Sequence, residues 1–125
     1  MTLANKKKTL VIGASTRPYR YSHTAVNQLN AYGHPVVAIG LRPGKIGETE
    51  IFTGFPDAEH VNTVTMYVGP ANQPQYYEYI LKTISPKRII FNPGTENETF
   101  EELARKQGIE VVENCTLAML TFGMY

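Results

Sequence analysis

The residues best suited to chemistry lie in one short segment near the start of the chain. It follows an apolar run and consists of Gly13, Ala14, Ser15, Thr16 and Arg17. Small residues let a phosphate approach the backbone N–H groups, because no side chain stands in the way. Two hydroxyls and a guanidinium add groups that bind a pyrophosphate. We interpret the segment as a phosphate-binding loop; in the alternative interpretation, Gly13 only turns the chain.

A second pair of cations, Arg42 and Lys45, is separated by the turn residues Pro43 and Gly44. Two positive charges on one turn suit an isolated phosphate group. The alternative is a solvated turn with no ligand, since proline and glycine are common turn residues for conformational reasons alone.

The first loop does not match the pattern of dinucleotide-binding proteins. It lacks the G-x-G-x-x-G spacing, and no acidic residue ends the second apolar run, where a ribose hydroxyl would be recognised. NAD is therefore disfavoured. NADP remains an alternative, because Arg42 and Lys45 could equally bind a 2′-phosphate.

Five apolar runs of strand length alternate with segments of helical spacing. The strands are expected at residues 10–12, 35–39, 64–68, 88–91 and 109–112. Such alternation predicts an α/β fold: a Rossmann-like, doubly wound, five-stranded parallel sheet with helices on both faces. The segment between the second and third runs has the character of a loop. We expect a single domain over 1–125, with residues 1–8, including the run Lys6 to Lys8, as a mobile tail.

The loops that follow the strands should meet at one edge of this sheet, because ligands bind beyond the carboxyl ends of parallel strands. Tyr21, in the first loop, could pack against part of a ligand. Asn92, Pro93 and Gly94 follow the fourth strand and are also candidates for ligand contact. Glu96 invites a catalytic interpretation, but the capping-box pattern from Thr95 to Glu98 explains it sufficiently.

The composition is that of an ordinary globular protein. Its 125 residues are 42% hydrophobic and 18% charged, with a net charge of +1, so we expect no nucleic-acid partner. No apolar run is long enough for a membrane span, and the single cysteine excludes an internal disulfide; both favour the cytoplasm. The three histidines lack the spacing of metal ligands, so no metal is expected.

Cys115 follows the fifth strand and precedes a short helical segment. Two interpretations stay open. A thiol at a helix terminus beside the ligand crevice would be reactive. A thiol packed at the sheet edge would be an inert, small hydrophobic residue.

Taken together, these segments resemble the CoA-binding domain proteins, small relatives of the cofactor-binding domain of the succinyl-CoA synthetase alpha subunit. The resemblance is carried by segments in the same order at five strand ends: Val11 to Ser15, Tyr21-Ser22, Leu41 to Lys45, Tyr67 to Ala71, Phe91 to Asn97 and Glu113 to Leu117. It implies a Rossmann-like fold with the CoA pyrophosphate over the first loop.

The resemblance also implies roles for particular residues. Gly13, Ala14, Ser15 and Arg17 would contact the pyrophosphate. Pro43 to Lys45 is similar to the segment beside the adenosine phosphate. Val68 to Ala71, which includes Pro70, is similar to the segment that lines the adenine pocket. The synthetase's second domain with its phosphorylated histidine is missing, so the resemblance does not extend to ligase chemistry.

We therefore expect a stand-alone protein that binds CoA or acyl-CoA, as a binding or regulatory module; whether it also has an enzymatic activity stays open. No catalytic residue is assigned. The alternatives are an NADP-binding enzyme and an interaction domain without a ligand. Oligomeric state and the presence of an acyl group stay open.

Overall fold

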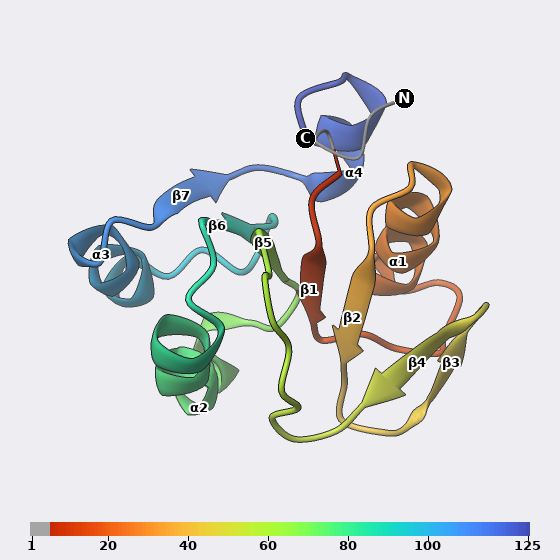
Figure 1. The fold of residues 1–125 in the computed structure, drawn as a ribbon, viewed down its shortest axis with the longest axis horizontal. Helices are drawn as coiled ribbons and strands as arrows, with labels where there is room; N and C mark the ends of the chain where they lie inside the picture. The colour runs from red at the N-terminus through yellow and green to blue at the C-terminus, as the bar shows by residue number, and fades with distance from the viewer. Residues whose placement is uncertain (1–5) are drawn as a thin grey trace.

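A computed structural model describes residues 6–125 and shows one sheet with helices on both of its faces (Figure 1). The strand order across the sheet is β3-β4-β2-β1-β5-β6-β7. The elements in chain order are β1 (Thr9–Ile12), α1 (Tyr21–Ala31), β2 (Val36–Ile39), β3 (Gly44–Ile46), β4 (Thr49–Phe52), β5 (Thr63–Met66), η2 (Pro70–Asn72), α2 (Pro74–Glu78), η3 (Tyr79–Ile84), β6 (Arg88–Phe91), α3 (Glu98–Lys106), β7 (Glu110–Glu113) and α4 (Thr116–Thr121).

The α/β class is confirmed, but the prediction of five strands is wrong. All five predicted strands are present and pair in parallel. Two further strands, β3 and β4, form an antiparallel hairpin in the segment expected to be a loop, and β4 joins β2 in parallel. The hairpin was missed because its strands are short. The available signal is Ile46 and Ile51, both buried, on either side of a turn that starts at Gly47 with φ +57.

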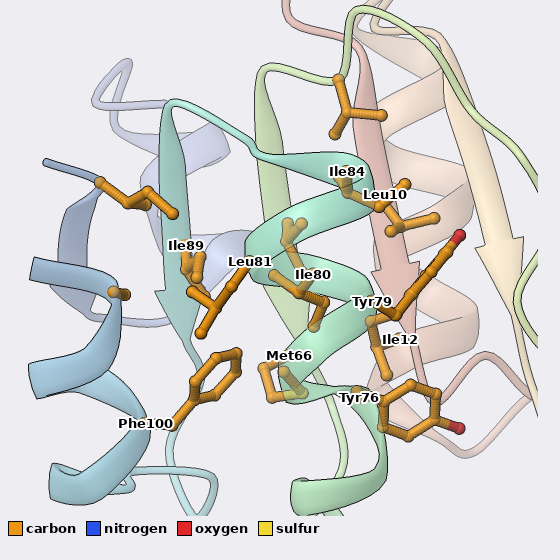
Figure 2. Packing of buried hydrophobic residues seen from close by; sticks show 14 of the residues in the cluster. Leu10, Ile12, Met66, Tyr76, Tyr79, Ile80, Leu81, Ile84, Ile89 and Phe100 are labelled. Carbon is orange, nitrogen blue, oxygen red and sulfur yellow. The ribbon is translucent and has the colours of Figure 1, made fainter. Parts of the chain in front are cut away.

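Alternating side chains of the central strands build two separate cores. In β1, Leu10 and Ile12 pack on one face of the sheet, whereas Val11 packs on the other. The first face is covered by α2, η3 and α3, whose buried residues include Ile80 and Phe100 (Figure 2). The second face is covered by α1 and α4. Burial on both faces explains why the strands are continuous apolar runs.

The lysine run of the expected mobile tail is hydrogen bonded in the structure. The ammonium of Lys6 donates to the carbonyl of Tyr32 (2.6 Å), and that of Lys7 to the carbonyl of Tyr125 (2.6 Å). The ammonium of Lys8 donates to the carbonyl of Glu59 (2.7 Å). The three lysines are therefore held by hydrogen bonds to the rest of the domain, which was not expected of a mobile tail. The remainder of the expected tail, residues 1–5, lies outside the described residues.

The start of α3 is capped two residues later than the sequence predicted. Asn97 is the N-cap, and its side chain accepts from the N–H of Phe100 (3.2 Å). The carboxylate of Glu101 accepts in return from the N–H of Asn97 (2.9 Å). Thr95 instead donates its hydroxyl to the carbonyl of Asn92 (2.8 Å). Within residues 6–125, each helix is too short or too polar to span a bilayer.

Candidate functional site

A cleft of about 930 Å³ lies at the carboxyl ends of β1, β2, β5 and β6, the place predicted for a ligand. We call it the main cleft. Among the predicted site residues, those that line it are Gly13, Ala14, Ser15, Thr16, Arg17, Tyr21, Arg42, Val68, Pro93 and Gly94. The lining residues that sequence reasoning did not assign to the site are Tyr19, Arg20, Ser22, Gly40, Leu41, Tyr67, Asn72, Gln75, Tyr76 and Thr95. Gly69, in the segment Val68 to Ala71 that the resemblance relates to the adenine pocket, also lines the cleft.

The first loop offers its backbone donors at different positions from those expected. The N–H groups of Gly13 and Ala14 both donate to the carbonyl of Ile39 (2.8 and 2.9 Å), so they are already engaged. The N–H groups of Ser15 and Thr16 have no acceptor among the described residues. The same holds for Tyr21 and Ser22 at the beginning of α1. Free N–H groups at the start of a helix form an anion-binding site together with the helix dipole.

Glycines allow the first loop to lie directly on its neighbours. Gly13 has φ +98, and a Cβ there would lie 2.8 Å from the carbonyl oxygen of Tyr67. A Cβ on Gly40 would lie 2.3 Å from the carbonyl oxygen of Ala14, and one on Gly44 would lie 2.6 Å from Cγ2 of Thr16. The position of the loop therefore depends on glycines in three separate segments.

The wall made by the loops after β5 and β6 is held by Gln73, which is fully buried. Its side-chain amide donates to the carbonyls of Val68 (2.9 Å) and Thr95 (2.7 Å). Its side-chain oxygen accepts from Asn97 (2.9 Å). Sequence reasoning missed this residue, because a glutamine beside a proline-started helix carries no signal of burial.

Asn92 has a different environment from the other predicted cofactor contacts. It is buried, and its amide nitrogen donates to the hydroxyl of Thr65 (2.7 Å) and the carbonyl of Met66 (2.8 Å). Its oxygen accepts from the N–H of Thr116 (2.8 Å), the first residue of α4. Because its side chain is used in these bonds, Asn92 connects β6, β5 and α4 and does not line the main cleft.

The two cations of the second predicted site are separated in the structure. Arg42 lines the main cleft, whereas Lys45 lies on β3, in register with Glu50 on β4. Pro43 and Pro70 are exposed and do not line the cleft either. Of the two cations expected to bind a phosphate, Arg42 alone is therefore placed to do so in the main cleft.

The main cleft is basic, and its rim is aromatic. Its cationic side chains are Arg17, Arg20 and Arg42, and the described residues that line it include no aspartate or glutamate. Tyr19 and Tyr21 are about three-quarters exposed, at 74% and 75%. Exposed aromatic side chains beside guanidinium groups suit a ligand with anionic groups and a flat ring.

Tyr67 and Cys115 are both half-buried, but of the two only Tyr67 lines the main cleft. Burial strongly raises the pKa of the Tyr67 phenol, so this group stays neutral and serves as a wall. Cys115 is half-buried, stands at the N-cap of the six-residue helix α4 and does not line the main cleft. The interpretation of Cys115 as a reactive thiol therefore stays a prediction, and the side chain is not part of the cleft lining.

Comparison with known families agrees with this geometry. A family model described as a CoA binding domain matches residues 7–121, nearly the whole chain. The chain belongs to the CoA-binding domain family. The resemblance read from the strand ends is thus confirmed at the level of the family. No curated protein matches the sequence significantly.

Solved structures of proteins of similar size show the same fold. One is a crystal structure of an uncharacterized protein, 44% identical, with a TM-score of 0.93, over 96% of this chain and 98% of that chain. A hypothetical protein from Pyrococcus horikoshii OT3 is 20% identical, with a TM-score of 0.84, over 98% and 86%. A protein from Thermus thermophilus is 19% identical, with a TM-score of 0.84, over 98% and 93%. The last two similarities concern the fold alone.

Proposed function

We propose that this protein is a stand-alone CoA- or acyl-CoA-binding protein with a Rossmann-like fold, and that it acts as a binding or regulatory module. The observation that carries the proposal is the main cleft: three arginines and free backbone N–H groups, without a lining carboxylate, in a member of the CoA-binding domain family. CoA carries a pyrophosphate, a separate phosphate on its ribose and an adenine, so a basic cleft with an aromatic rim suits it.

The donor set divides among the parts of this cofactor. Ser15, Thr16 and the start of α1 would hold the pyrophosphate with backbone N–H groups, assisted by Arg17. Arg42, after β2, would neutralise the ribose phosphate. Val68 and Pro93 would contact apolar parts of the ligand. When bound, CoA supplies a thiol that carries acyl groups.

The lining residues support the interpretation of the main cleft as a binding site. Its described part contains no aspartate, glutamate, histidine, lysine or cysteine, and its cations are arginines, which bind anionic groups. Its hydroxyl groups belong to serine, threonine and tyrosine side chains, among them Ser15 and Thr16.

An NADP-binding protein is the second candidate. The observation in its favour is Arg42, which follows β2, where a 2′-phosphate would be recognised. It also fits the absence of an acidic residue at this strand end.

A thermal-melting series with CoA, acetyl-CoA, NADP and NAD tests both candidates. A ligand that binds only the folded state stabilises it, by about 2.7 kcal/mol at a hundredfold excess over Kd. We expect CoA to raise the melting temperature of the wild type and to raise that of Arg17→Gln less. Arg105→Gln, on α3 outside the main cleft, is the matched control. A rise with NADP and none with CoA would replace the proposal with its rival.

A further inference from the structure

A second cavity lies at the opposite end of the sheet from the main cleft. Segments that precede β1, β2, β5 and β6 enclose about 620 Å³ there. We call it the basic cavity, because Lys6, Lys8, Lys87 and His60 line it. Its volume falls within the range of roughly 300–1,000 Å³ that is typical of small-molecule sites.

Cationic side chains predominate among the charged residues that line the basic cavity. No aspartate or glutamate is among the described residues that line it. Lys8 donates to a backbone carbonyl, that of Glu59, which positions its ammonium without neutralising it. Three lysines in one concave site attract an anion.

Neutral hydrogen-bond donors accompany these cations. The side-chain oxygen of Asn62 accepts from the hydroxyl of Thr63 (2.7 Å), while its NH₂ group donates to no described residue. The hydroxyl of Ser85 also has no partner among residues 6–125. Both residues line the basic cavity. Charged and neutral donors together form the kind of set that binds phosphate oxygens.

The backbone at the basic cavity includes one unusual conformation. Among the described residues, the non-glycine residues with positive φ are His60 (+59) and Ser85 (+47), and both line the basic cavity. Ser85 is the C-cap of η3, where a left-handed residue is common. His60 lies in no helix or strand, and there a left-handed conformation is unfavourable for a residue with a Cβ.

We propose that the basic cavity is a second ligand site, which takes a soluble small molecule with a phosphate or pyrophosphate group. It is separate from the main cleft and does not depend on the identity of the ligand there. A small molecule is favoured over a nucleic acid because the charges line a concave cavity, whereas the net charge of the whole chain is only +1.

Inorganic pyrophosphate, titrated into the full chain and followed by amide NMR shifts, tests the proposal. We expect saturable shifts at Asn62, Ser85 and Lys87. Lys87→Gln, which alters an exposed side chain with no described partner, should weaken binding severalfold, and Lys8→Gln with Lys87→Gln at least tenfold. The double variant Lys82→Gln with Lys106→Gln, which removes the same charge elsewhere, should bind as the wild type does.

Several outcomes would overturn the second site. They are the absence of saturable shifts at the cavity, an equal loss in the control variant, shifts confined to Ser15 and Thr16, and tighter binding of a single-stranded oligonucleotide than of pyrophosphate. The arginine variant of the main cleft, Arg17→Gln, should leave pyrophosphate binding at the cavity unchanged. This comparison distinguishes a failure of the second site from a failure of the CoA assignment.

Discussion

The backbone N–H groups of Ser15 and Thr16 donate to no acceptor among the described residues. Those of Gly13 and Ala14 both donate to the carbonyl of Ile39. The composition of this loop predicted that it could receive a phosphate. It could not show which amides are free, because the competing acceptor belongs to another strand. At the scale of single residues, sequence therefore identifies the loop, and long-range hydrogen bonds decide its donors.

The separation of Arg42 from Lys45 leads to a prediction about the ribose phosphate. Arg42→Gln should remove most of the preference for CoA over dephospho-CoA, a loss of about 1.5–3 kcal/mol for one charge-assisted contact. Lys45→Gln should have little effect, since Lys45 does not line the main cleft. Calorimetric titration of both ligands into both variants measures the difference. Equal affinity of the wild type for the two ligands would contradict this role.

Gly40 gives a second prediction at this scale. In Gly40→Ala, the added Cβ would overlap the carbonyl oxygen of Ala14, at 2.3 Å, so the first loop must shift. We expect a destabilisation of about 1–3 kcal/mol and weaker CoA binding. Gly69→Ala is the control for stability, because a Cβ there meets nothing within 4 Å and φ is −63. Urea unfolding measures the stability of both variants. Equal stability of the two would show that the close approach of Gly40 to Ala14 does not require a glycine.

At the scale of elements, Gln73 joins the loops after β5 and β6 through two carbonyls that are otherwise far apart in the sequence. Gln73→Met preserves approximate size but leaves both carbonyls without this donor. Each unsatisfied buried group costs about 1–3 kcal/mol, so both stability and CoA affinity should fall. Gln28→Met, on the exposed side of α1, should change neither. Unchanged CoA affinity in Gln73→Met would show that the wall does not need this link.

How far sequence reasoning reached also differs between elements. The central strands were predictable because burial on both faces makes them continuous apolar runs, such as Leu10 to Ile12. The β3–β4 hairpin was not, since each strand contributes one deeply buried residue, Ile46 or Ile51, and such a short alternation resembles a loop. The cap of α3 was misplaced because Thr95 and Asn97 are both good capping residues. The structure distinguishes them by the bonds that Asn97 makes with Phe100 and Glu101.

At the scale of the whole molecule, His34 links the first described residues to the last. Its Nδ1 accepts from the N–H of Lys7 (2.9 Å), and its ring lies 4.9 Å from that of Tyr125. Burial, followed by the cations Lys6, Lys7 and Arg88, lowers the pKa of His34 below its usual value of 6.5. The unfolded chain therefore binds this proton more readily than the folded one.

The sign of the resulting pH dependence follows. The contribution of neutral His34 is complete above about pH 6.5 and is lost as the pH falls from there to the lowered pKa of the folded state. We expect the free energy of unfolding to decrease over that window in the wild type, and to decrease less in His34→Gln. His23→Gln, in an exposed hydrogen bond, should keep the wild-type dependence. Urea unfolding from pH 7.5 to pH 5 measures all three proteins, and identical slopes would contradict the assignment.

The two borders of the sheet carry charges of opposite sign. β7 has Glu110 and Glu113 at its ends, and β3 has Lys45 at its centre. If two copies paired symmetrically through their β7 strands, a glutamate of one copy would lie opposite a glutamate of the other, whether the strands ran parallel or antiparallel. If two copies paired through their β3 strands in antiparallel fashion, the two Lys45 side chains would lie opposite each other. Like charges directly opposite each other disfavour such pairing, and charged edges are a common protection against aggregation. Symmetric assembly by continuing the sheet is thus disfavoured at both borders.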